Sequence, residues 1–193
     1  MPTALTNRLA EIWTSTTRRA SSPEVRTARM ADDLRHAAEL VTEHRRSLGP
    51  RGEDRTAGPV TSDVVRRCTH PHGRLLLATV GDRPVGVAAV RRAGRHSSVG
   101  RVDEVGELHW LYVRPHARAS GALDLLLDRV MVATWWLGCQ RLRLDADRGL
   151  GDEDRATLER LGFRSVRPDP ALGGHDRRWL EVALDGEETA RPA

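Results

Sequence analysis

The chain has 193 residues, of which 39% are hydrophobic, and this is enough for one compact domain with its own core. No apolar run is long enough to span a bilayer, and the first twenty residues lack the apolar centre of a secretion signal, so we expect a cytoplasmic protein. All 31 Lys and Arg positions are arginine, yet the net charge is only +4 and carboxylates separate the arginine pairs, which disfavours a nucleic-acid binder without excluding one.

The N-terminal third predicts a short strand and two helices. Residues 1–22 form an extension, because Ser and Thr clusters and a proline interrupt its apolar pattern. A strand is expected at Val25–Arg29, followed by a helix that Asp32 caps and whose apolar residues recur on one face. The polar stretch Gly49–Pro59 predicts a loop, and Thr61–Cys68 predicts a second short helix.

Two apolar runs in the middle of the chain predict a β-hairpin. Arg74–Val80 and Pro84–Arg91 are separated only by Gly81-Asp82-Arg83, which is a turn signal between two strands. A loop at Ala93–Val102 then leads to a strand at Val105–Val113. The hairpin strands should therefore be antiparallel neighbours within a larger sheet.

The C-terminal half alternates helices and strands. Leucines, Val130 and Met131 fall on one face of a helix expected at Ser120–Leu137, and Gly138 closes it. The remaining predicted elements are a strand at Arg141–Asp145, a helix capped near Asp152, a strand opened by Gly162-Phe163, a strand at Trp179–Leu184 and a frayed tail at 186–193.

The most informative segment joins the strand at Val105–Val113 to the following helix through a turn that contains Gly121. The first N–H groups of a helix have no acceptor within the helix, and the helix dipole adds partial positive charge there. Such a start binds an anion without a basic side chain, and glycine lets the backbone approach phosphate oxygens closely. The segment therefore predicts a pyrophosphate site.

Val113-Arg-Pro115 followed by Arg118-Ala-Ser-Gly121-Ala-Leu123 resembles the signature of the GNAT superfamily of N-acetyltransferases, which is Val-x-Pro and then Arg/Gln-x-x-Gly-x-Gly/Ala. The resemblance implies an α/β (α+β) fold in which residues 23–185 form a single GNAT-like domain. Its central sheet would be mixed, mostly antiparallel and twisted, with six to seven strands flanked by about four helices. It also implies acetyl-CoA as cosubstrate.

The resemblance assigns the cofactor-binding residues. Backbone groups of Leu111, Tyr112 and Val113 would pair with the pantetheine arm, and the N–H of Val113 would face the thioester carbonyl. The pyrophosphate would be held by Arg118 and by the main chain of five residues, which are Ala119, Ser120, Gly121, Ala122 and Leu123.

Glu107 and His109 are the candidate catalytic residues. Strict alternation along the strand places Glu107, His109, Leu111 and Val113 on one face, and Leu108, Trp110 and Tyr112 on the other. In the family that this segment resembles, a glutamate at the position of Glu107 often accepts the proton of the amine, directly or through water. An imidazole titrates in the useful range, so His109 is a second acceptor. The alternative is structural: Glu107 pairs with an arginine and His109 is an ordinary sheet residue.

The chain departs from the family pattern at the general acid. The position of the usual tyrosine is Leu158, and the usual asparagine seven residues earlier is Gly151. Tyr112, the only tyrosine, is expected to pack on the opposite strand face. Leu123 replaces a small residue, so it either crowds the phosphates or turns into the core.

Other conspicuous residues receive structural interpretations. Cys68 and Cys139 are too few for a disulfide framework, and the histidines in turns (His70, His72 and His116) lack metal-ligand spacing, so we expect no metal. One residue of the Trp135-Trp136 pair should face inward and the other outward, where it would suit a homodimer contact.

Three functions remain open. The leading one is acetyl-CoA-dependent N-acetylation of a small amine or a peptide amino terminus. The alternatives are a catalytically silent acyl-CoA sensor and an aminoacyl-tRNA acetylating toxin. The acceptor depends on the loops Gly49–Pro59, Ala93–Glu104 and Pro168–His175, which carry no signature, although Asp103 and Glu104 beside Glu107 suggest a cationic molecule.

Overall fold

The computed structural model describes residues 22–48, 71–93, 105–147, 150–166 and 178–184. Several expectations lie outside these ranges: the extension at residues 1–21, the loop at 49–59, the helix at 61–68, most of the loops at 93–104 and 168–175, and the tail at 186–193. Cys68 and His70 lie outside them as well.

Seven strands form one sheet in the order β1-β2-β3-β4-β5-β7-β6. All neighbouring strands are antiparallel except β4 and β5, which are parallel. The strands are β1 Pro23–Thr27, β2 Gly73–Val80, β3 Arg83–Arg92, β4 Val105–Val113, β5 Arg141–Asp145, β6 Arg164–Val166 and β7 Trp179–Ala183. The predicted mixed, mostly antiparallel sheet is confirmed, and so is the hairpin, whose turn contains Gly81 at a φ of +59°.

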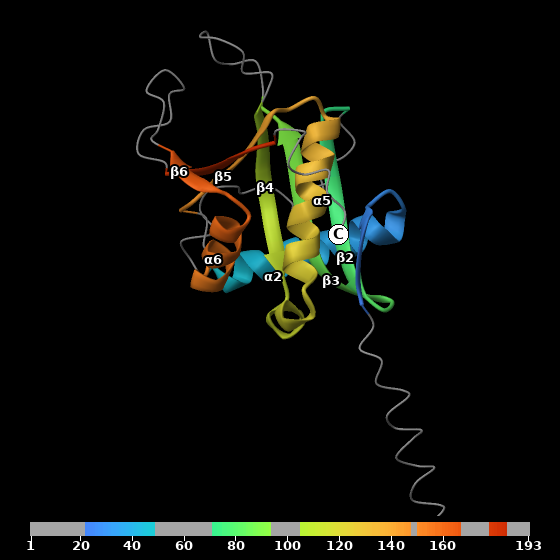
Figure 1. The fold of residues 1–193 in the computed structure, drawn as a ribbon. Coiled ribbons are helices and arrows are strands. Elements are labelled where there is room, and N and C mark those ends of the chain that lie inside the picture. Colours follow the sequence, from blue (N-terminus) through green and yellow to red (C-terminus); the bar gives the residue numbers. More distant parts are fainter. Residues whose placement is uncertain (1–21, 49–70, 94–104, 148–149, 167–177, 185–193) are drawn as a thin grey trace, which may run out of the picture.

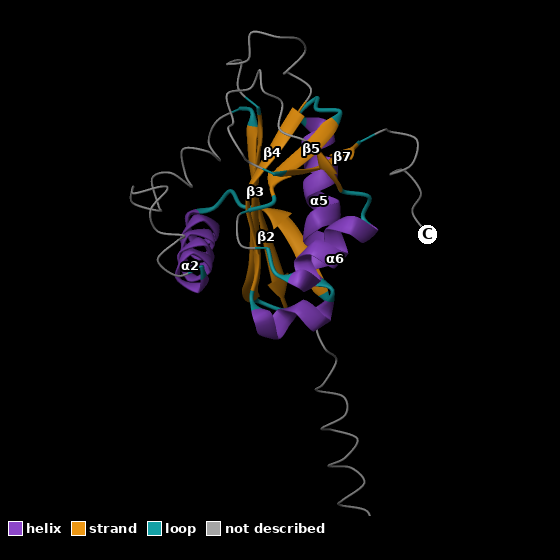
Figure 2. Cartoon of the chain, turned by 90° about the vertical axis from the view of Figure 1, so that its left-hand side faces the viewer, coloured by secondary structure: helices purple, strands orange, loops and turns teal. Residues whose placement is uncertain are grey.

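Helices cover both faces of the sheet (Figures 1 and 2). Helix α2 (Ala31–Ser47) packs on one face, and helices α5 (Ala122–Trp136) and α6 (Asp152–Arg160) lie on the other. The short 3-10 helix η2 (Pro115–Ser120) connects β4 to α5.

Each face of the sheet has its own hydrophobic core. On the α2 side, Leu40 and Val41 pack against side chains of β2 and β3, and both are fully buried. On the α5 side the core is larger and includes Leu126, Leu127 and Phe163, all with 0% exposure. Burial of apolar surface on both faces makes the central strands continuous hydrophobic runs, as the sequence shows for β2 and β3.

Two helices begin slightly differently from the prediction. Helix α2 starts at Ala31, so Asp32 lies inside its first turn, and the carboxylate of Asp33 accepts the N–H groups of Arg29 and Met30 at 3.3 and 3.4 Å. Helix α6 starts at Asp152, and the N–H of Gly151 donates to the carboxylate of Asp154 at 3.2 Å. In both cases the capping carboxylate sits at the third helical position.

The expectation that one of the two tryptophans faces inward is wrong. Trp135 is 50% exposed and Trp136 is 73% exposed, and their rings contact each other edge to face at 5.3 Å. The inward positions of this turn are taken by Met131 and Thr134, because residues three and four apart share a helix face. The homodimer contact stays a prediction.

Candidate functional site

The candidate site lies where the central sheet opens. The parallel pairing of β4 with β5 runs only from Val105 with Arg141 to Leu108 with Leu144. Strand β4 then continues to Val113, whereas β5 ends at Asp145. Beyond Leu108, residues 110–113 of β4 are paired with β3 on one side, and residues 109–113 have no strand partner on the other among the described residues.

A β-bulge at His109 changes the faces of β4. Residues Trp110 and Leu108 pair with consecutive residues of β3, so His109 has no opposite residue. Leu108 consequently joins the core on the α5 side, together with Leu111 and Val113. The prediction from strict alternation, which placed Glu107 on the face of Leu111 and Val113, is therefore wrong. The extra residue of the bulge reverses the order in which side chains alternate between the two faces, so Glu107 lies with Trp110 and Tyr112 on the α2 side.

The backbone at the open edge is available for pairing. The N–H of Arg114 donates to the carbonyl of Val85 at 2.8 Å, so Arg114 faces β3. Successive residues of an antiparallel strand present their N–H and C=O groups to opposite sides. Leu111 and Val113 therefore present theirs to the open edge, where an extended chain can add as another strand.

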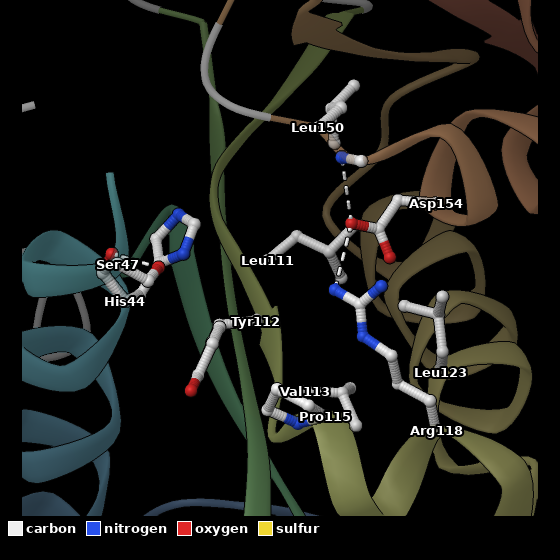
Figure 3. Close-up of a pocket in the computed structure, with 11 residues that line it drawn as sticks. His44, Ser47, Leu111, Tyr112, Val113, Pro115, Arg118, Leu123, Leu150 and Asp154 are labelled. Carbon is white, nitrogen blue, oxygen red and sulfur yellow. Dashed lines mark hydrogen bonds and ion pairs between the residues drawn. The ribbon is translucent and has the colours of Figure 1, made fainter. Parts of the chain in front are cut away.

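A hollow of about 230 Å³ lies beside this edge (Figure 3). Five of its eleven lining residues were assigned to the cofactor from the sequence, namely Leu111, Tyr112, Val113, Arg118 and Leu123. The others come from both faces of the sheet: His44 and Ser47 of α2, Pro115 of η2, and Leu150, Gly151 and Asp154 at the start of α6. Side chains from opposite faces can line one hollow here because the sheet is open between β4 and β5.

The turn beneath the hollow has the geometry expected for anion binding. Gly121 has a φ of +80°, a left-handed conformation that favours glycine, and a Cβ placed on it would meet no atom within 4 Å. Helix α5 begins at the next residue without a side-chain cap. The N–H groups of its first turn therefore have no acceptor within the helix. Asp124 in that turn is bound by Arg160 at 2.6 Å, which offsets its charge.

The other residues assigned to the pyrophosphate have separate surroundings. Ala119 is exposed, Ser120 Oγ donates to the carbonyl of Ala117 at 2.6 Å, and Ala122 is fully buried. None of them lines the hollow, so only their main chain can contribute. Leu123 is 6% exposed and packs in the core, as the second of the two alternatives expected, and it also contributes to the lining of the hollow.

Arg118 is held by two carboxylates of α6. Its NH2 group lies 3.1 Å from Asp154 Oδ2 and its NH1 group 3.4 Å from Glu153 Oε2. Its Nε is buried and has no hydrogen-bond acceptor among the residues that the structure describes. The guanidinium therefore keeps one buried N–H without an acceptor there, and its charge is partly compensated.

Glu107 is engaged by an arginine, as the structural alternative expected. Arg143 of the adjacent strand donates to Oε1, and Arg143 itself stacks on the ring of Trp179 at 4.6 Å. Oε2 of Glu107 lies 3.5 Å from His109 Nε2. Burial alone would raise the pKa of Glu107, but the hydrogen bond and charge of Arg143 keep this pKa below its ordinary value. Neither Glu107 nor His109 lines the hollow; both lie further back along β4.

His44 was not predicted from the sequence as a site residue, although a signal for it was present. Leu34, Ala37 and Val41 predict the buried face of α2, and adding three residues brings the same face to His44. The face leaves the core at this point and reaches the open end of the sheet. Leu158, which stands where the family usually has a tyrosine, is 0% exposed and packs in the core.

Two further properties concern the described residues alone. None of the helices there combines the length and the apolar composition of a membrane span. His, Cys, Asp and Glu side chains do not gather there in threes as metal ligands would.

The model of the acetyltransferase (GNAT) family matches residues 35–163, which is more than half of the chain. No curated protein matches the sequence at a significant level. Solved structures resemble it in fold at low sequence identity. An acetyltransferase of the GNAT family from Staphylococcus aureus Mu50 has a TM-score of 0.65 and 15% identity, over 84% of this chain and 99% of that one.

Two of the similar structures contain coenzyme A. An aminoglycoside 6'-N-acetyltransferase complexed with coenzyme A has a TM-score of 0.60 and 16% identity, covering 88% of this chain and 99% of that one. The N-acetylglutamate synthase from Neisseria gonorrhoeae, complexed with coenzyme A and N-acetyl-glutamate, has a TM-score of 0.56 and 19% identity. It matches 84% of this chain but only 35% of that one. At such identities the likeness concerns the fold.

Proposed function

Because the chain belongs to the GNAT acetyltransferase family, we propose that it transfers an acetyl group from acetyl-coenzyme A directly to a primary amine of a small molecule or a peptide amino terminus. The observation that carries the proposal is the hollow at the open edge of β4, with the uncapped start of α5 beneath it. Similar structures that hold coenzyme A, one of them an aminoglycoside N-acetyltransferase, support it.

The residues present suit the diphosphate of coenzyme A. Open space over Gly121 admits phosphate oxygens to the first-turn N–H groups of α5, and the buried Nε of Arg118 adds a charged donor. Leu111 and Val113 pair with the pantetheine arm through their edge-facing backbone groups, and the Val113 N–H stabilises the carbonyl oxygen as negative charge develops. When bound, acetyl-coenzyme A supplies an acetyl group activated as a thioester.

Glu107 and His109 prepare the acceptor. An amine is protonated at neutral pH, with a pKa of roughly 10, and must lose a proton before it can attack. The Glu107 carboxylate, kept ionised by Arg143, attracts the cationic acceptor, and His109 beside it receives the released proton through water. We also propose that the protein is cytoplasmic and that it forms a homodimer.

A thiol-release assay tests the proposed function. Acetyl-coenzyme A is mixed with the protein and with spermidine, kanamycin or an alanyl peptide, and free thiol is followed by its absorbance after reaction with a disulfide reagent. The wild type should release thiol with at least one amine, and Glu107→Ala should slow the release by about a hundredfold or more. Equal rates for the variant and the wild type would remove Glu107 from the mechanism.

The buried Leu158 favours a second function, that of a sensor that binds acyl-coenzyme A without turnover. Calorimetry separates the two. Coenzyme A binding without thiol release for any of the amines identifies the sensor, and absence of binding rejects both functions. Binding of tRNA that weakens steeply with salt would instead favour the aminoacyl-tRNA alternative.

A further inference from the structure

His44 occupies a position in the hollow that the family resemblance does not assign. It lies in the last turn of α2, and its imidazole extends toward the open end of β4, opposite Leu111 (Figure 3). The ring packs against that of Tyr112, with centroids 5.2 Å apart and planes inclined by 35°. Among the residues that the structure describes, no hydrogen bond engages either ring nitrogen. The ring is therefore positioned by packing, and its nitrogens are left for another partner.

The surroundings keep this imidazole neutral. The titratable and charged groups that act on it or contact it come from three elements around the hollow: Asp154 of α6, Arg118 of η2 and Tyr112 of β4, and the ion pair of Glu43 with Arg114 acts in turn on Tyr112. Burial lowers the pKa of His44; the carboxylate of Asp154 opposes this effect and Arg118 adds to it. At neutral pH a nitrogen lone pair is consequently available as a proton acceptor.

Acetyl transfer leaves one proton to be moved inside the site. After the ammonium has lost its first proton, the attacking nitrogen becomes acidic as it bonds to carbon, and the departing sulfur becomes basic. The side chain that commonly supplies a proton in this family is replaced by the buried Leu158. A group that lies close to both reacting atoms can pass the same proton from nitrogen to sulfur, as the histidine of a catalytic triad does.

We propose that His44 is this group: a catalytic residue that takes the proton from the attacking amine and returns it to the sulfur. The assignment rests on the proposed function. His44 accepts the proton as the C–N bond forms, and its imidazolium then donates the proton to sulfur as the C–S bond breaks. The products are an amide and a free thiol, and His44 returns to its neutral form, so atoms and charge balance. Tyr112 acts as a positioning residue that holds the ring.

A variant pair on one helix tests the proposal. His44→Gln removes the titratable group but keeps a polar side chain of similar size, and His36→Gln changes a histidine two turns earlier on α2, away from the hollow. With saturating acetyl-coenzyme A, His44→Gln should lower kcat about a hundredfold and change the KM for acetyl-coenzyme A less than about threefold. His36→Gln should leave both constants unchanged.

Two readouts separate a chemical role from a structural one. The acidic limb of the kcat/KM pH profile should become less steep in His44→Gln, because one of the two proposed titrating bases, His44 and His109, is lost. Added imidazole should restore activity to His44→Ala, whose shortened side chain leaves room in the hollow. In NMR titrations of the full chain, the imidazole signals absent from His44→Gln should show a pKa below the ordinary 6.5 and should shift when coenzyme A is added.

The outcomes distinguish this inference from the proposed function. If the wild type acetylates an amine and His44→Gln matches it in kcat and pH profile, His44 is not the proton carrier although the enzyme function stands. If imidazole does not restore activity to a folded His44→Ala that still binds coenzyme A, His44 is likewise not the proton carrier. A wild type without thiol release overturns both.

Discussion

Substitutions at Gly121 separate backbone strain from anion binding. The residue has a φ of +80° and open space where a side chain would extend, so any L residue is strained there without a clash. The left-handed conformation costs an L residue about 1–2 kcal/mol. Gly121→Ala should therefore destabilise the fold, and for a domain of this size its melting temperature should fall by about 2–8 °C. In Gly121→Glu the attraction between the carboxylate and the start of α5 offsets part of the same strain, so its melting temperature should fall less.

The two variants should differ in their affinity for coenzyme A. Alanine leaves the first-turn N–H groups of α5 accessible, so its binding should stay within about threefold of the wild type. A carboxylate at a helix start interacts with the dipole with about 0.3–2 kcal/mol, and the glutamate at position 121 competes with the diphosphate for the same donors. Its own charge also repels the phosphates, so Gly121→Glu should weaken coenzyme A binding about tenfold or more relative to Gly121→Ala.

Calorimetry with two ligands checks this prediction. Pantetheine lacks the diphosphate, so its affinity should be the same in Gly121→Ala and Gly121→Glu, whereas the affinity for coenzyme A should differ between them. If both variants bind coenzyme A equally well, the start of α5 does not hold the diphosphate and the reasoning from its N–H groups is refuted.

Two further predictions concern stability. A Cβ at Gly106 would overlap the methyl group of the buried Thr134, so Gly106→Ala should lower the free energy of unfolding by about 1–3 kcal/mol in thermal denaturation. Adding Thr134→Ser to this variant should recover part of the lost stability, and purely additive effects of the two substitutions would contradict the contact. Glu43 accepts two hydrogen bonds from Arg114, at 2.6 and 2.9 Å, and both side chains are about a third exposed, so Glu43→Gln should cost only about 0.5–1 kcal/mol at pH 7. The hydrogen bonds and charge of Arg114 lower the pKa of Glu43, so the stabilisation by this pair is present above the ordinary pKa of 4.5 and is lost as the pH falls through the lowered value. The difference in unfolding free energy between Glu43→Gln and the wild type should therefore shrink in acid. A difference that persists there would contradict the ionic origin of the stabilisation.

Much of the fold follows from local patterns in the sequence. The hairpin of β2 and β3 is predicted by two apolar runs around a glycine turn. Helix α5 is predicted by Leu123, Leu126 and Leu127, which lie at helical spacing and reach the core. The turn at Gly121 was also predictable, because glycine is favoured where the backbone is left-handed. These features depend on residues close together in the chain, and their periods are fixed by backbone geometry.

The contacts that define the site were harder to predict. The bulge at His109 is fixed by pairing with β3, and nothing in residues 105–113 alone reveals the missing partner. Glu107 meets Arg143 because the two occupy equivalent positions of parallel strands, although 36 residues separate them in sequence. Which of the many arginines pairs with a given carboxylate depends on the register of the sheet, and the register depends on packing of the whole domain.

The opening between β4 and β5 explains how the proposed proton acceptor and the proposed anion site can come from opposite faces of the sheet. A closed sheet would keep α2 apart from η2 and α6, whereas here His44 and Asp154 line the same hollow. In the proposed complex, the N-terminus of α5 holds the diphosphate on one face, and the edge of β4 directs the acyl arm through the gap toward α2. An acceptor that approaches from the α2 side meets Glu107 and Tyr112 first, because the bulge turned Glu107 to that face. The one-residue irregularity thus brings the carboxylate and His44 to the same side of the sheet, where, in the proposed reaction, the ammonium loses two of its three protons.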